Sequence, residues 1–327
     1  MKTKLTAIAV AAAGALIAAP VFAAVPKTST DPATLARGAD VATAYVDDTT
    51  FVNGDVRVEL GGRYPWLLGR SGADHLVAVS DKNIKVRRID PTGGVTTVLT
   101  VRDAASVHLS ENGRKIVITG VTGGKNQPRT IYSARTGEKL QSRKFDLYPT
   151  TVGMKGAKVM FTSQEGGTFW WNTRKDTIKL VTKRVSGAVD FRHDLMSSFT
   201  ADVYAGGCML LTSISDPKTP SWRSCKERVE SFSPDGRLIS TVPILSDGIG
   251  PREVTVRTVT GTRVATYTTT GWFGRVDWED DDTLLLESHG KKQSAVVRCT
   301  VTECENATDP EPTEDPVNEQ SLSRGRP

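Results

Sequence analysis

The chain of 327 residues carries 42 Lys and Arg against 37 Asp and Glu, giving a formal net charge of +5, and 38% of its residues are hydrophobic. This basic excess is small and scattered along the chain, which argues against a nucleic-acid-binding protein. The hydrophobic fraction is sufficient for a globular core. Beyond the first 24 residues, no apolar segment is long enough to suggest a membrane span.

Residues 1–24 have the pattern of a secretory signal peptide. A basic start, MKTK, precedes an Ala-rich apolar run from Leu5 to Ala19 and the small-residue sequence PVFAA. We expect cleavage after Ala23 or Ala24. An uncleaved anchor is the weaker alternative, because the run is shorter than the ~20 residues that span a bilayer. No Cys follows it, which argues against a lipoprotein. We therefore expect an exported protein, secreted or held in the periplasm or cell envelope.

A polar linker is expected at residues 25–44, followed by one folded domain at 45–305. Within the domain, the stretch ESFSPDGRLIST (Glu230–Thr241) breaks a strand-like alternation for a few residues. Pro234 presets φ at the first turn position, Asp235 suits the second, and Gly236 can adopt the left-handed conformation. This pattern predicts a tight antiparallel hairpin.

The same turn recurs along the chain with a spacing of roughly 40–46 residues, which is typical of propeller blades. One unit fits poorly, because Leu195 stands where glycine is expected and Asp194 is the nearest turn former. The residues that mark the turns are Gly72, Gly113, Gly156, Asp194, Gly236 and Asp282.

A second turn follows later in several units, at Thr92-Gly93, Thr136-Gly137 and Thr260-Gly261. Each lies between two runs of β-forming residues. Two turns per unit indicate two hairpins, and hence a four-stranded blade.

The sequences FSPDGRLI (Phe232–Ile239) and LSENGRKI (Leu109–Ile116) resemble pieces of the secreted TolB-like and WD-repeat-like β-propellers. The resemblance covers about Tyr64–Val301. It implies propeller architecture and says almost nothing about function. The Gly-His and Trp-Asp pairs of strict WD repeats are missing, so the hydrogen-bond network of that family is not carried over.

Closure of the ring is predicted from the hairpin signal at Asn53-Gly54, because Val56–Leu60 runs directly into the first unit. The last unit shows only three clear strands, near Arg275, Leu284 and Val296. We expect Val56–Leu60 to be its fourth strand. The fold class is then all-β, a six-bladed β-propeller of four-stranded antiparallel blades closed by an N-terminal strand.

Four cysteines in an exported chain indicate disulfides rather than a metal site. Of three possible pairings we favour Cys208–Cys225 and Cys299–Cys304, which are close in sequence. The tail from Asn306 to Pro327 is acidic and Pro-rich without apolar periodicity, and we expect it to be disordered.

Motifs for catalysis, phosphate binding or calcium binding are missing from the chain, so we expect no catalytic residue, cofactor or metal. The four histidines lie in four different units: His75, His108, His193 and His289. The densest titratable clusters, DFRHD (Asp190–Asp194) and EDDD (Glu279–Asp282), fall at hairpin turns. We interpret both as solvated turns, because hairpins favour polar turn residues.

One face of a propeller carries the links into the inner strands and the loops between second and third strands. Aromatic and Arg side chains there would suit a binding surface, with ordinary surface as the plain alternative. The residues that this chain places on that channel face are Tyr64, Tyr148, Arg228, Asp247, Trp272, Phe273, Arg275 and His289.

These features favour an exported, non-catalytic propeller that binds a protein, peptide or envelope component across the channel face. The alternative is a propeller hydrolase or lyase that acts on a sugar or lactone with residues from several blades. A purely architectural role is a third possibility. Fold alone does not decide among them.

Overall fold

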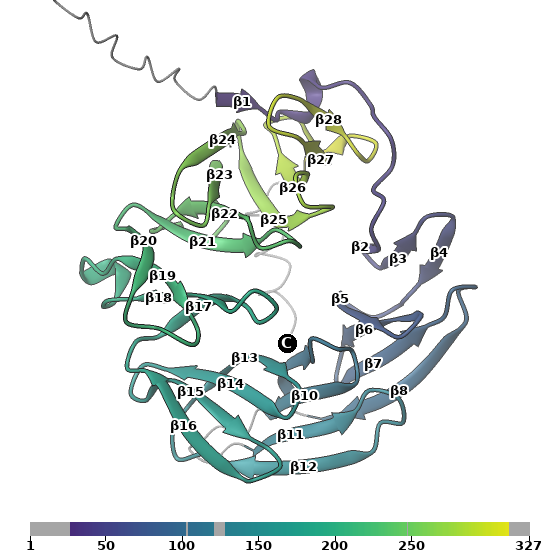
Figure 1. Ribbon diagram of the computed structural model, residues 1–327. Helices are drawn as coiled ribbons and strands as arrows, with labels where there is room; N and C mark the ends of the chain where they lie inside the picture. The colour runs from purple at the N-terminus through teal and green to yellow at the C-terminus, as the bar shows by residue number, and fades with distance from the viewer. Residues whose placement is uncertain (1–26, 103, 121–127, 247, 314–327) are drawn as a thin grey trace, which may run out of the picture.

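Seven β-sheets surround a central axis in the computed structural model, and the chain folds as a β-propeller (Figure 1). The structure describes residues 27–102, 104–120, 128–246 and 248–313. The expected signal peptide and the end of the expected tail lie outside this range. We number the blades 1 to 7 in chain order.

Blade 1 has three strands and each later blade has at least four. Blade 1 consists of β2 (Tyr45–Asp47), β3 (Thr50–Asn53) and β4 (Val56–Glu59). Blade 2 consists of β5 (Tyr64–Ser71), β6 (Asp74–Ser80), β7 (Ile84–Ile89) and β8 (Val95–Val101). Blade 3 consists of β9 (Ala104–Leu109), β10 (Lys115–Gly120), β11 (Pro128–Ser133) and β12 (Lys139–Lys144). Blade 4 consists of β13 (Thr150–Lys155), β14 (Lys158–Ser163), β15 (Gly167–Asn172) and β16 (Thr177–Thr182).

The remaining blades follow the same meander, with additions at their outer edges. Blade 5 consists of β17 (Ser186–Asp190), β18 (Leu195–Phe199), β19 (Met209–Ser213) and β20 (Pro220–Ser224), with the short 3-10 helix η2 (Val203–Ala205) in a loop. Blade 6 consists of β21 (Glu227–Phe232), β22 (Leu238–Pro243), β23 (Glu253–Thr258) and β24 (Arg263–Thr268), extended by β1 (Lys27–Ser29). Blade 7 consists of β25 (Trp272–Trp278), β26 (Leu284–His289), β27 (Gln293–Cys299) and β28 (Cys304–Asn306), and β29 (Glu311–Pro312) also pairs with β27.

The turns expected from the sequence separate the strands as predicted. Gly113, between β9 and β10, has φ 67°, and a Cβ there would lie 2.2 Å from the carbonyl oxygen of Arg70 in blade 2. Only glycine satisfies both the conformation and the close approach. Asp194 adopts φ 60° where glycine was expected, which is a conformation that Asp tolerates better than most residues.

The prediction of six blades is wrong, and so is the predicted closure. Strand β4, expected to complete the last unit, pairs with β3 in a sheet of its own. The fourth strand of blade 7 is β28, which follows a tight turn spanned by the Cys299–Cys304 disulfide. The sequence analysis counted blades by the turn between their first and second strands. Blade 1 lacks that hairpin, so it was not counted.

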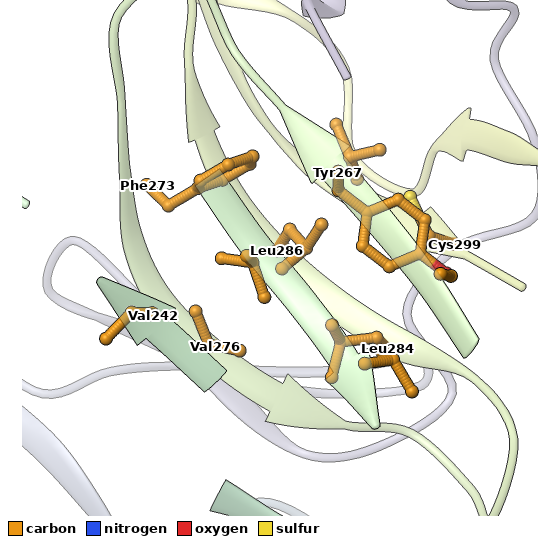
Figure 2. Close-up of a cluster of buried hydrophobic side chains, with 11 residues drawn as sticks. Val242, Tyr267, Phe273, Val276, Leu284, Leu286 and Cys299 are labelled. Atoms are coloured by element: carbon orange, nitrogen blue, oxygen red, sulfur yellow. The ribbon is translucent and has the colours of Figure 1, made fainter. Parts of the chain in front are cut away.

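Apolar clusters fill the junctions between neighbouring blades. The cluster between blades 6 and 7 is the largest and includes Tyr267 and Phe273, both almost fully buried (Figure 2). The cluster between blades 7 and 1 is small, with only Val41, Leu285 and Ala307 buried among the described residues. Hydrophobic stabilisation scales with the apolar area removed from water, so this junction receives the smallest apolar contribution among the described clusters.

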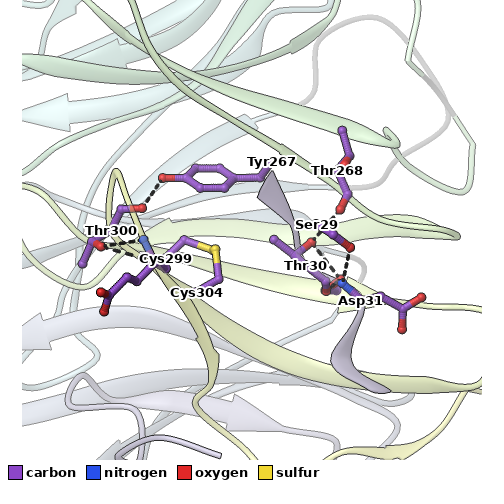
Figure 3. Close-up of a disulfide and its surroundings, with 10 residues drawn as sticks. Ser29, Thr30, Asp31, Tyr267, Thr268, Cys299, Thr300 and Cys304 are labelled. Atoms are coloured by element: carbon purple, nitrogen blue, oxygen red, sulfur yellow. Dashed lines mark hydrogen bonds between the residues drawn. A yellow bond between two sulfur atoms is a disulfide. The ribbon is translucent and has the colours of Figure 1, made fainter. Parts of the chain in front are cut away.

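The N-terminal segment forms a strap over blades 6 and 7. Strand β1 pairs in parallel with β24, and the buried Thr30 donates a hydrogen bond to the carbonyl oxygen of Thr268 at 3.1 Å (Figure 3). Beyond it lies the 3-10 helix η1 (Pro32–Thr34). Asn306 then donates from Nδ2 to the carbonyl oxygens of Pro32 at 2.9 Å and Leu35 at 3.1 Å.

Both predicted disulfides, Cys208–Cys225 and Cys299–Cys304, are present. Among the described residues, no helix combines the length and apolarity needed to cross a bilayer.

Candidate functional site

A cavity of about 840 Å³ opens at the centre of the ring. The inner strands of blades 2 to 6 line it, together with hairpin-turn residues such as Glu111, Arg192 and Pro234. These turns follow the ends of the inner strands. The cavity therefore opens at the face opposite to the one that we predicted, which carries the starts of the same strands.

The wall of the cavity mixes apolar and charged side chains. Leu67, Val107 and Val152 supply apolar surface, and Glu230 adds a carboxylate. Several inner strands contain a bulge, for example between Val229 and Ser231. A bulge bends the strand and changes which side chains it presents, so the plain alternation of a strand does not predict the composition of this wall.

His108 lies half-buried on the cavity wall, on β9. Burial lowers the pKa of its imidazole, because the charged form loses solvation. A neutral imidazole can donate one hydrogen bond and accept another. His108 is therefore suited to polar recognition at neutral pH.

Asp190 lies on the cavity wall and is held in place by its own turn. Its Oδ1 accepts a hydrogen bond from the backbone N–H of Arg192 at 2.8 Å, and its Oδ2 lies 2.6 Å from Nδ1 of His193. A Cβ on Gly236 of blade 6 would meet the His193 ring at 2.3 Å, so that ring packs against the next blade. His193 is not part of the wall. The Asp190–His193 pair thus stabilises the turn of blade 5, and the His193 ring contacts blade 6.

The interpretation of Asp190–Asp194 as a purely solvated turn missed its position. Asp190, Phe191 and Arg192 all line the cavity. The density of titratable residues was the only sequence signal for this site.

The structure brings together only some of the residues predicted on the channel face. Trp272 and His289 stack with their ring centroids 4.4 Å apart and their planes at 6°. Glu287 links His289 to Arg275, with Nε2 of His289 3.3 Å from Oε1 and the backbone N–H of Arg275 donating to Oε2 at 3.0 Å. Glu287 was missed, and its pairing across β25 and β26 is visible only in the structure.

The other predicted residues do not join this group. Tyr64 and Tyr148 are 63% and 55% exposed on other blades. Phe273 is fully buried in the core, and Arg228 lies 3.5 Å from Glu230 in an ion pair. Asp247 falls outside the described residues.

Two carboxyl groups near Arg275 have shifted pKa values. The hydrogen bond from His289 lowers the pKa of Glu287. Burial raises the pKa of Asp277, despite its ion pair with Arg275 at 3.2 Å. Among the described residues, no three His, Cys, Asp or Glu side chains are grouped as metal ligands would be.

Comparison with known proteins identifies the fold and no family. No family model matches the chain, and no curated protein matches it. An acylaminoacyl peptidase from Pyrococcus horikoshii is similar over 83% of this chain and 54% of its own, with 10% identity and a TM-score of 0.58. An oligogalacturonate lyase in complex with manganese is similar over 82% of this chain and 89% of its own, with 13% identity and a TM-score of 0.56.

A chain of the mitotic checkpoint complex is similar over 76% of this chain and 80% of its own, with 15% identity and a TM-score of 0.53. These likenesses concern architecture alone, because identity is low throughout. They include a hydrolase, a lyase and a component of an assembly, so they do not decide between the candidate functions.

Proposed function

We propose that this chain is an exported, non-catalytic propeller that binds a partner protein, peptide or envelope component through the mouth of its central cavity. The observation that carries the proposal is the open cavity of about 840 Å³, whose wall combines apolar surface with carboxylates and a neutral imidazole. Such a combination suits recognition, because apolar contact supplies affinity and a few polar groups supply specificity.

Two serines on the wall, Ser231 and Ser233, are engaged in structural contacts rather than arranged as nucleophiles. Ser231 Oγ lies 2.6 Å from Ser240 Oγ, and Ser233 Oγ donates to Asp235 at 2.7 Å. Neither serine has a histidine partner among the described residues. A serine nucleophile requires a base within hydrogen-bond reach, so these two serines favour the binding function over a hydrolase that uses a serine nucleophile.

Export is part of the proposal. The signal-peptide pattern of residues 1–24 supports it, and the two disulfides agree with an oxidising compartment.

The test compares two faces of the same molecule. The purified chain is cross-linked to envelope and secreted fractions of the source organism, and the partner recovered is then bound to variants. We expect Glu111→Ala with Glu230→Ala to weaken binding at least tenfold. The matched control, Tyr64→Ala with Tyr148→Ala on the opposite face, should bind like the parent.

If the Tyr64/Tyr148 variant loses binding and the Glu111/Glu230 variant keeps it, the site lies on the face predicted from the sequence. Recovery of no specific partner, or turnover of a sugar or lactone substrate, would overturn the proposal.

A further inference from the structure

Blade 1 lacks one strand of a full blade, and its contacts show which one. In the later blades, the turn between third and fourth strands contacts the outermost strand of the preceding blade. A Cβ on Gly137 would meet the Val98 carbonyl oxygen at 2.0 Å, and one on Gly261 would meet the Trp222 ring at 2.2 Å. The equivalent Gly93 of blade 2 faces Val56 and Val58 of β4, both 3.4 Å from its would-be Cβ. Strand β4 is therefore the outermost strand of blade 1.

The chain path agrees with this assignment. Outermost strands lead into the next inner strand through short links, such as residues 225–226 before β21 and 145–149 before β13. Residues 60–63 connect β4 to β5 in the same way. Since β2, β3 and β4 are then the second, third and fourth strands, the innermost position of blade 1 is vacant among the described residues. In Figure 1, β2 is the strand of its sheet nearest the ring centre.

The vacancy leaves backbone groups of β2 without a strand partner. Asp47 and Thr50 flank a two-residue turn and so form a hydrogen-bonded pair, which leaves Val46 and Phe51 as the non-hydrogen-bonded pair. The N–H and C=O of Val46 therefore point to the free edge. The Val46 carbonyl oxygen accepts a hydrogen bond from Nη2 of Arg275, 3.4 Å away in blade 7. No described strand pairs with this edge. An unpaired edge is a template for an added strand.

A cleft of about 340 Å³ runs beside this edge, between blades 7 and 1. Six carboxylates and three arginines line it, so its net charge is negative. They are Asp40, Asp47, Asp48, Glu287, Asp309 and Glu311, with Arg37, Arg57 and Arg275. Arg37 is already bonded to Asp40 and Asp309, and among the described residues Asp47, Asp48 and Glu311 take part in no salt bridge.

We propose that the vacant innermost position of blade 1 receives an extended, cationic segment of a partner protein, which pairs with the free edge of β2. An extended backbone can accept from the N–H of Val46 and donate to its C=O, which Arg275 contacts at 3.4 Å. Basic side chains on the added strand balance the carboxylates of the cleft that form no salt bridge. This site is separate from the cavity mouth, so each can be tested without the other.

The experiment measures binding of a fluorescein-labelled peptide with alternating Lys and Val, by anisotropy, to the full purified chain. An alternating Glu and Val peptide and a Pro-interrupted Lys and Val peptide serve as controls. We expect only the uninterrupted basic peptide to bind, more weakly as salt rises. Its binding should slow amide hydrogen exchange at residues 44–48, a readout that needs no variant.

Variants then locate the contact. Val46→Pro removes the free N–H, and Asp47→Asn with Asp48→Asn removes two carboxylates; each should weaken peptide binding at least tenfold. Glu59→Pro, at the outer edge of the same sheet, is the matched control and should bind like the parent, as should Glu111→Ala at the cavity mouth.

Other outcomes overturn the proposal. Unchanged exchange at residues 44–48, or equal binding of the acidic peptide, would exclude strand addition at β2. If the basic peptide binds only after Arg324→Gln and Arg326→Gln in the chain's own C-terminal segment, that segment is the occupant and no partner is needed.

Discussion

The hydroxyl of Tyr267 donates a hydrogen bond to the carbonyl oxygen of Thr300 at 2.7 Å (Figure 3). Tyr267 lies on the outermost of the four meander strands of blade 6, and Thr300 lies in the turn between the last two strands of the blade 7 meander. The bond therefore joins neighbouring blades, and its donor side chain belongs to the large apolar cluster between them.

Replacing Tyr267 with Phe should lower the free energy of unfolding by about 1–2 kcal/mol, because the Thr300 carbonyl loses its donor. Urea denaturation of both proteins measures this difference. Burial also raises the pKa of Tyr267 to about 12, so its phenol should ionise after the exposed tyrosines in an ultraviolet absorbance titration. Ionisation together with the other tyrosines would contradict its burial.

The ion pair between Glu227 and Arg257 should be the most sensitive charge contact of blade 6. Arg257 donates to both carboxylate oxygens, from Nε at 2.7 Å and Nη2 at 2.5 Å, and lies 5.3 Å over the Trp222 ring of blade 5. We expect Glu227→Gln to cost roughly 3 kcal/mol, because Arg257 would remain largely buried without its partner. The control Glu253→Gln, which breaks an exposed pair with Lys27, should cost less than about 1 kcal/mol.

The same pair predicts acid sensitivity. Burial opposes ionisation of Glu227, but hydrogen bonds from Arg257 and Thr241 outweigh it and lower its pKa. A carboxyl group with a lowered pKa in the folded state stabilises the protein above its unfolded value of about 4.3 and loses this contribution as pH falls below it. Stability measured from pH 6 to pH 3 should fall less in Glu227→Gln than in the parent.

The two disulfides should contribute differently to the free energy of unfolding. Cys208 and Cys225 are 17 residues apart, whereas Cys299 and Cys304 are 5 apart. The chain-entropy relation gives about 3 kcal/mol for the longer loop and about 2 kcal/mol for the shorter one. Calorimetry of the two paired Cys→Ser variants tests this order, and a larger loss from the shorter loop would show that packing of the buried Cys299 dominates.

Two histidines should make the protein less stable in mild acid. Burial lowers the pKa of both His75 and His108. As pH falls below the unfolded value of about 6.5, the unfolded chain takes up protons that these folded-state imidazoles do not yet bind, so stability decreases. The variant with His75→Gln and His108→Gln should show a flatter stability profile between pH 7 and pH 5 by urea denaturation. An unchanged slope would assign the acid sensitivity to other groups.

Local sequence patterns were sufficient to predict the hairpins, the four-stranded blades and the disulfide pairing. Turns such as Gly113 are encoded within a few residues, because their backbone conformation restricts the side chain. Cysteines close in sequence and joined by a hairpin left little choice of partner.

The number of blades and the location of the cavity depend on contacts between distant residues. Blade 1 has no Gly-marked first hairpin, so its hairpin at Asn53-Gly54 resembled an addition to another blade. Phe273 has the aromatic character of a binding residue and lies in the core instead, because successive side chains of β25 point to opposite faces and Trp272 takes the other one. Whether a side chain such as Asp190 faces a central cavity follows from the closed ring, which no single segment specifies.

The pairing of β1 and the hydrogen bonds of Asn306 to Pro32 and Leu35 affect how the protein would respond to a pulling force. A pulling force applied between the two ends of the described chain would first load the three paired residues of β1 at one end and the two paired residues of β29 at the other. It would reach the two hydrogen bonds of Asn306 next. The ring would then part at the junction of blades 7 and 1, whose apolar cluster is the smallest, while the remaining blades kept their shape.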